Sequence, residues 1–199
     1  RLDVRAVESD VPVLQESDEV MIRGIDTDNY DGLVPEHHFR WLYDTHAIRF
    51  NIIGLEARMP FARQQKEACE AAGIMVPFAY KFLYWRDDDL ERMKDVCRFG
   101  EPIAIDCEAD TTWSPDRVME RIGEAKDLLT REGLYWGIYT GEWWWSPKTR
   151  NSTDCATDKL WHAAYPFGNQ LPPDNYMPPE GMQVDYGGWV EAQVHQYAN

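Results

Sequence analysis

The sequence is short of basic residues and of long apolar runs, and each shortage excludes a class of protein. Among 199 residues, 20 Lys and Arg stand against 35 Asp and Glu, so the formal net charge is −15 at pH 7. A protein that neutralises nucleic-acid phosphates needs the opposite balance, and we therefore expect no nucleic-acid partner. No apolar run approaches the roughly 18 residues of a membrane-spanning helix, so we expect no membrane partner either.

Cysteine and histidine are scarce and irregularly placed. The four cysteines form no Cys-x-x-Cys pair, and the five histidines form no His-x-x-x-His or His-Glu-x-x-His pattern. These absences argue against a disulfide framework and against a zinc site. We expect four reduced thiols and no metal site.

Aromatic residues, by contrast, are abundant, with nine Trp, ten Tyr and seven Phe. A core of this size seldom needs so many Trp, which favours a surface use such as stacking against flat ligands. The length suits one domain with a sizeable core. We interpret residues 1–20 as an N-terminal arm or linker and residues 21–199 as one domain.

From Met21 to Thr140, apolar runs of strand length alternate with longer amphipathic segments. The predicted strands are Met21–Asp26, Ile48–Leu55, Ile74–Phe82, Pro102–Cys107 and Leu134–Thr140. The predicted helices are His37–His46, Phe61–Ala72, Asp87–Cys97 and Pro115–Glu132, the last capped by Ser114. Such a series of β–α units indicates a parallel sheet.

The alternation breaks after Thr140, because residues 142–159 show no clear period, and we expect no regular helix there. A strand is predicted at Leu160–Tyr165, and short strands near Met182–Val184 and Gln193–Tyr197 follow a proline-rich connection. About eight strands, without a Gly-x-Gly-x-x-Gly loop after the first, predict an α/β fold of the TIM-barrel type. This would be an irregular β/α barrel, about five β/α units followed by three strands.

Carboxylates lie where the predicted strands end, which is where β/α barrels carry their active sites. Asp26 ends the first strand, Glu56 follows the second, and Asp106 and Glu108 end the fourth. Asp106 and Glu108 are two positions apart on an extended segment, so their side chains project to one side. Convergent carboxylates near aromatic residues suit cleavage of a glycosidic bond, in which one acid is protonated and another ionised. A solvated loop start and a site for a hard cation remain alternative interpretations.

Five short motifs occur in the order and at about the spacing seen in one enzyme family. They are Gly24-Ile25-Asp26, IDCE at Ile105–Glu108, IYTG at Ile138–Gly141, LWHAAY at Leu160–Tyr165 and HQY at His195–Tyr197. From about Met21 to Asn199 the chain resembles family 25 glycoside hydrolases, the lysozymes or N-acetylmuramidases of bacteria and phages. The resemblance implies a hydrolase that cleaves the bond between N-acetylmuramic acid and N-acetylglucosamine in peptidoglycan, without a cofactor.

The resemblance also implies roles for individual residues. Glu108 would be the general acid, Asp106 would stabilise the transition state or orient the substrate's acetamido group, and Asp26 would support them. Gln196 falls on the glutamine of the family's last motif. The aromatic residues implied to line the saccharide groove are Tyr80, Tyr139, Trp161 and Tyr165.

Three departures from the family pattern sustain a second hypothesis. Lys81 replaces the usual histidine, which would place a cation near the carboxylates and lower their pKa values. His195 replaces a tryptophan, and the chain stops before the family's last aspartate, a position that Asp185 would have to fill. The alternative is therefore a catalytically degenerate barrel that serves as a saccharide-binding or structural module of a phage tail or wall-directed protein. A chitinase-like hydrolase is less favoured, because Ala104 stands where a further acid is needed.

The implied function also predicts where the protein works. A lysozyme acting in cell wall degradation, such as an endolysin, is extracellular or wall-directed, and one carried by a bacteriophage is virion-associated. Its partners would be peptidoglycan or a related polysaccharide and, in addition, other domains of a longer chain or a phage particle.

Trp143–Trp145 are interpreted equally well as core packing and as sugar-stacking residues.

Overall fold

A parallel sheet of seven strands forms the centre of the molecule. The computed structural model describes residues 22–28, 31–55, 59–165 and 183–196. Neighbouring strands pair in parallel and follow one another in chain order. The strands are β1 (Arg23–Thr27), β2 (Ile48–Gly54), β3 (Ala79–Phe82), β4 (Ile103–Asp106), β5 (Tyr135–Thr140), β6 (Leu160–Ala163) and β7 (Val194–Gln196).

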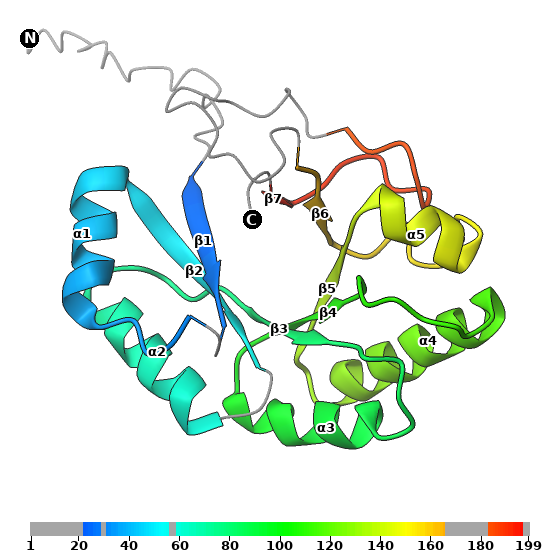
Figure 1. The fold of residues 1–199 in the computed structure, drawn as a ribbon, viewed down its shortest axis with the longest axis horizontal. Helices are drawn as coiled ribbons and strands as arrows, with labels where there is room; N and C mark the ends of the chain where they lie inside the picture. Colours follow the sequence, from blue (N-terminus) through cyan, green and yellow to red (C-terminus); the bar gives the residue numbers. More distant parts are fainter. Residues whose placement is uncertain (1–21, 29–30, 56–58, 166–182, 197–199) are drawn as a thin grey trace, which may run out of the picture.

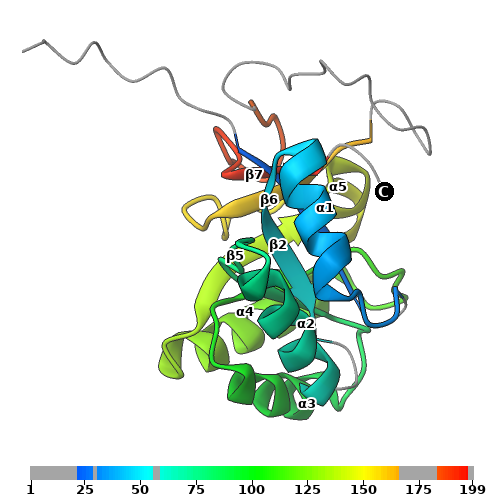
Figure 2. The same ribbon diagram turned by 90° about the vertical axis from the view of Figure 1, so that its left-hand side faces the viewer.

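The helices cover the outside of this sheet, which curls into a half-barrel (Figure 1). They are α1 (Glu36–His46), α2 (Met59–Ala71), α3 (Asp89–Val96), α4 (Pro115–Arg131) and α5 (Glu142–Thr149), with a 3-10 turn at Cys97–Phe99. Helices α1 to α4 follow the sheet along its outer side, as the second view also shows (Figure 2). The predicted α/β class with a barrel-like parallel sheet is confirmed.

Local sequence signals explain the best-defined helix. The Ser114 side chain accepts a hydrogen bond from the Arg117 backbone N–H at 3.3 Å, and Pro115 occupies the first turn, as predicted. Val118, Ile122 and Leu129 are buried along one face of α4. This spacing of three to four residues is what packs a helix against a sheet.

The two faces of the sheet carry two separate apolar clusters. The outer cluster joins the helices to strand residues such as Ile103, Ile105 and Ile138. The inner cluster is small and contains Ile52, Phe78, Ala104, Tyr139, Trp161 and Ala163. Alternate residues of a strand face opposite sides of the sheet. The residues of these strands that face the inner side are therefore the ones that can line the cavity described below.

Three predicted elements differ from the structure. The third strand begins at Ala79 instead of Ile74. Before it there is only an isolated bridge between Met75 and Phe50. Pro77, between Met75 and Ala79, has no N–H to donate to a strand ladder. The segment after Thr140, expected to lack a helix, forms α5 and buries Trp144 and Trp145. Near the predicted strand at 182–184, the described part shows an isolated antiparallel bridge of Gln183 with Glu191.

Some predictions fall on residues that the structure does not describe. The arm at 1–20 and the proline-rich connection at 166–181 both lie outside the described ranges. Within those ranges, no helix has the length and apolar character needed to cross a membrane. The four cysteines, all of them described, are free thiols.

Candidate active site

A cavity of about 680 Å³ opens at the carboxyl ends of the strands. Its lining contains two kinds of side chain, carboxylates and aromatic rings. The described residues that line it are Asp26, Asp28, Asp31, Tyr80, Phe82, Tyr84, Asp106, Glu108, Tyr139, Trp143, Trp161, Tyr165 and Gln196. Eight of the nine candidate site residues named from the sequence are therefore in one place, and Asp185 is the exception.

Asp106 and Glu108 both face the cavity, and the residue between them faces the other way. Asp106 is only 2% exposed, and Cys107 is fully buried in the outer cluster. The Cys107 backbone N–H donates to the Tyr139 carbonyl at 2.9 Å, and its carbonyl accepts from the Thr140 hydroxyl at 2.8 Å. The extended backbone is thus held against β5 on both sides of Cys107, which keeps the two carboxylates on one face.

The surroundings of Glu108 act on its pKa in two opposite directions. Burial raises the pKa of the Glu108 carboxyl above its ordinary value, and a hydrogen bond from Tyr139 partly opposes this. The Tyr139 hydroxyl donates to Glu108 Oε2 at 3.3 Å and lies 2.9 Å from the Tyr165 hydroxyl. Two tyrosines therefore orient this carboxyl and supply a donor that favours its ionised form.

Asp26 lies across the cavity on β1 and is contacted by the last strand. Although Asp26 is open to the cavity, the surrounding protein removes much of its hydration, and this together with the negative charge of Asp31 raises the pKa of Asp26 to about 6. The Gln196 side-chain amide donates to Asp26 Oδ1 at 3.2 Å. The Gln196 side chain on β7 thereby connects the last described strand with β1 at the cavity.

Aromatic rings form the walls around these carboxylates. The Trp161 ring packs against Tyr139 at 4.5 Å between centroids and edge-on against Tyr80 at 5.7 Å. Trp161 and Tyr139 both line the cavity although each is largely buried. Flat rings at the walls of a carboxylate cavity suit the apolar faces of sugar rings.

The three consecutive tryptophans divide between the two interpretations offered for them. Trp143 is 55% exposed and lines the cavity, whereas Trp144 and Trp145 are buried. A Cβ added at Gly141 would lie 2.3 Å from Trp143 Nε1, so the indole packs directly on the Gly141 backbone. One tryptophan of the run is therefore available to a ligand and the other two form core.

The expected effect of Lys81 on the carboxylates is wrong for the two whose pKa shifts are resolved. Lys81 occupies the position on β3 between Tyr80 and Phe82, which line the cavity, and is itself buried and absent from the lining. Its ammonium lies 5.3 Å from the centroid of the Tyr84 ring. The pKa values of Asp26 and Glu108 are raised, not lowered, since desolvation has the largest effect on each.

Asp185 and His195 lie away from the lining. Asp185 is exposed, and its neighbour Tyr186 is buried with its hydroxyl 2.9 Å from His162 Nδ1. The His195 ring is T-shaped to His162 at 5.1 Å, and burial lowers the pKa of His195. Glu56 lies outside the described residues. Among the described residues of 183–193, which include Asp185, none lines the cavity.

Three lining residues were not predicted from the sequence, namely Asp31, Phe82 and Tyr84. Phe82 and Tyr84 continue the alternation that begins at Tyr80, so the period of two along β3 was a usable signal. Asp31 lies beyond the end of β1, where the path of a loop is not readable from a local pattern. In the described residues, no group of three or more His, Cys, Asp or Glu has an arrangement that could hold a metal ion.

The fold has known structural relatives. No protein-family model matches the chain, and no curated protein sequence matches it significantly. Among solved structures, a muramidase from Trichobolus zukalii superposes with a TM-score of 0.67 at 21% identity, over 89% of this chain and 87% of that one. A family GH25 lysozyme from Aspergillus fumigatus gives a TM-score of 0.68 at 16% identity, with coverages of 87% and 86%. A bacterial lysozyme from Streptomyces coelicolor gives 0.62 at 15% identity, with coverages of 90% and 85%.

Proposed function

We propose that this chain, whose fold is that of the GH25 lysozymes, is a peptidoglycan muramidase. The observation that carries the proposal is the convergence of Asp26, Asp106 and Glu108 on one aromatic-lined cavity. The bond to be cleaved is that between N-acetylmuramic acid and N-acetylglucosamine. The structural relatives include proteins named muramidases, which makes this saccharide the first substrate to test.

In this proposal Glu108 is the general acid. A group that protonates a leaving oxygen must carry its proton near the working pH, and burial raises the pKa of Glu108 in that direction. After Glu108 has given up the proton, the hydrogen bond that Tyr139 already donates to it favours the ionised carboxylate. The same contact therefore supports the charge that the reaction creates on Glu108.

Asp106 and Asp26 would act on the sugar without donating a proton to the leaving group. Asp106, two positions before Glu108 on the same face, would orient the acetamido group or stabilise positive charge at the reacting carbon. Asp26, held by Gln196, supports the site from the opposite strand. Trp143, with half of its surface bare at the cavity, offers a flat surface for a further sugar ring.

The test is the release of new reducing ends from isolated peptidoglycan of several wall types. Glu108→Gln keeps the size of the side chain and removes its proton, so we expect a loss of about 100-fold or more. Glu67→Gln is the matched control, because Glu67 is an exposed carboxylate on α2. Undiminished release by Glu108→Gln would remove Glu108 from the role of acid.

The same assay separates the proposal from its alternative. Wild-type protein that binds wall fragments but releases no reducing ends on any wall type would be a saccharide-binding or structural module built on this fold.

A muramidase, in contrast, must work at the cell wall, so an extracellular or wall-directed location follows from the proposal. Association with a virion, other domains or a phage particle is the finer part of the proposal, and locating the protein in purified particles would test it.

A further inference from the structure

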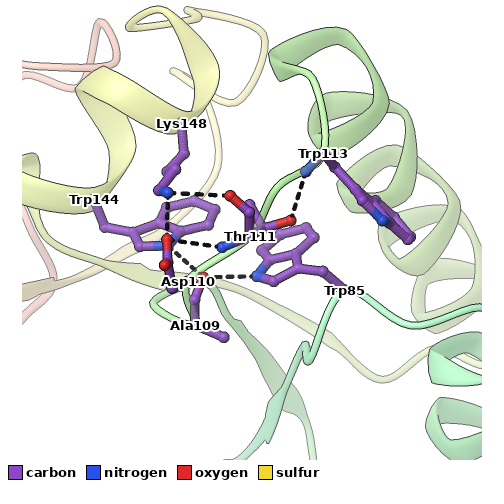
Figure 3. Close-up of polar contacts among 7 residues, drawn as sticks. All are labelled: Trp85, Ala109, Asp110, Thr111, Trp113, Trp144 and Lys148. Carbon is purple, nitrogen blue, oxygen red and sulfur yellow. Dashed lines mark hydrogen bonds and ion pairs between the residues drawn. The ribbon is translucent and has the colours of Figure 1, made fainter.

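The backbone carbonyl that follows Glu108 receives two indole N–H groups. Trp85 Nε1 donates to the Ala109 carbonyl at 2.9 Å, and Trp144 Nε1 donates to the same oxygen at 2.7 Å (Figure 3). Trp85 follows β3 and Trp144 belongs to α5, so two separate elements meet at this one atom. Their rings are stacked, with centroids 5.1 Å apart and an interplanar angle of 17°.

Trp85 holds this position in an uncommon backbone conformation. Its φ is 60°, in the left-handed region that residues other than glycine rarely adopt, and its side chain is only 5% exposed. Such a conformation costs energy and persists when the surrounding contacts over-determine it. The stacked ring and the hydrogen bond to Ala109 are the contacts that hold Trp85 there.

Helix α5 holds the same loop at a second point. Lys148, one turn after Trp144, donates to the Thr111 carbonyl at 3.2 Å and pairs with the Asp110 carboxylate (Figure 3). On the other side of Glu108, the Cys107 carbonyl accepts from the Thr140 hydroxyl. Glu108 is thus flanked by two backbone carbonyls, each fixed by side chains of other elements.

We propose that Trp85 and Trp144 are positioning residues for Glu108. By fixing the Ala109 carbonyl they set the direction in which the backbone leaves β4, and so hold the Glu108 carboxyl beside Tyr139 inside the cavity. The proposal rests on the proposed function in that Glu108 is the group being positioned. It makes the two indole N–H groups, and not merely the volume of the rings, necessary to the site.

Replacement of tryptophan by phenylalanine tests this distinction, because it keeps an aromatic ring and removes the N–H donor. The test variants are Trp85→Phe, Trp144→Phe and the double variant. Trp145→Phe and Trp189→Phe are matched controls, since each of these buried indoles also donates to a backbone carbonyl, of Ser152 and Asp158 respectively, each at 3.0 Å. Neither Ser152 nor Asp158 lines the cavity.

The kinetic readout is the split between kcat and KM on peptidoglycan fragments. We expect the double variant to lose at least about tenfold in kcat with KM within about twofold, because binding walls remain while the acid loses its direction. Each single variant should lose less, since one donor remains. The control variants should keep kcat within about twofold even if their melting temperatures fall equally.

A second readout requires no hydrolysis. Titration of the Glu108 carboxyl by NMR should show its pKa falling by at least about 0.5 unit in the double variant, toward the ordinary value, as water reaches a less fixed side chain. If the wild-type protein has no activity, the proposed function is overturned. The Glu108 titration can still be measured, and it then decides whether Trp85 and Trp144 position Glu108. If the double variant does not fold, the single variants provide both readouts. Variants that match Trp145→Phe and Trp189→Phe in kcat and in the Glu108 titration would show that Trp85 and Trp144 only fill space.

Discussion

At the scale of the residue, Asp26 lies where solvent can enter but where its charge is poorly hydrated. The pKa of Asp26 is raised from 3.8 to about 6, first by desolvation and then by the charge of Asp31. Between these two pH values the folded protein binds more protons than the unfolded chain, so stability falls as pH rises. Above about pH 6 Asp26 is ionised in the folded protein, and the free energy of unfolding is lowered by the full cost of this poorly hydrated charge.

Asp26→Asn should therefore stabilise the protein at neutral pH and not at low pH. The amide retains the oxygen that accepts from Gln196 and removes the ionisation. We expect a melting temperature a few degrees above that of the wild type at pH 7.5, where about 1 kcal/mol corresponds to about 2–4 °C in a domain of this size. The two proteins should melt together near pH 3. A difference that is the same at both pH values would contradict the raised pKa.

At the residue scale, the position of a side chain could be predicted from the sequence where strand alternation decides it. Asp26, Asp106 and Glu108 reach one cavity because the carboxyl ends of parallel strands meet there. The same alternation would have turned Lys81 away from the lining, had it been applied to β3. Asp185 lies in a segment without a regular period, so its position depends on tertiary contacts that no local pattern contains.

At the scale of the element, α5 shows how burial overrides a weak helical pattern. No helix was expected because residues 142–159 show no clear apolar period, and Pro147 inside α5 is itself unfavourable to a helix. Two adjacent tryptophans are nevertheless buried, and their indoles donate to Ala109 and Ser152. Stability of α5 thus comes from contacts with distant segments, whereas that of α4 is readable from its cap and its apolar face.

The pairing of β5 with β6 depends on the absence of a side chain at Gly137. A Cβ there would lie 2.3 Å from the Lys159 carbonyl oxygen, which accepts from the Ile138 N–H at 2.9 Å. Gly137→Ala should lower the free energy of unfolding by about 1–3 kcal/mol in urea denaturation.

Gly123 in α4 is the matched control for this substitution, because nothing lies within 4 Å of a Cβ added there. Gly123→Ala should raise the free energy of unfolding by roughly 0.5–1 kcal/mol, as expected inside a helix. Equal effects of the two substitutions would refute the close approach at β5 and β6.

At the scale of the whole molecule, the net charge of −15 acts on the approach to a substrate. Five of the described residues that line the cavity are also carboxylates. If the substrate is a wall that carries anionic polymers, the protein and the wall repel each other over about one Debye length, roughly 30 Å at 0.01 M salt and 8 Å at 0.15 M.

Hydrolysis of anionic walls should consequently rise severalfold when NaCl increases from about 10 to about 150 mM at fixed pH, as screening weakens the repulsion. Walls stripped of their anionic polymers provide the control and should show little change. A rate that falls with salt on intact walls would indicate attraction by a local basic surface instead.

The hydrogen bond between Gln196 and Asp26 joins residues 170 positions apart. Because a chain is synthesised from its N-terminus, the strands β1 to β6 are synthesised before Gln196 is added to the chain. A contact of such long sequence separation also forms slowly, since the ends of a long loop must first meet. The site is consequently completed late in biosynthesis, so an unfinished chain carries its acid residues without the contact that β7 supplies.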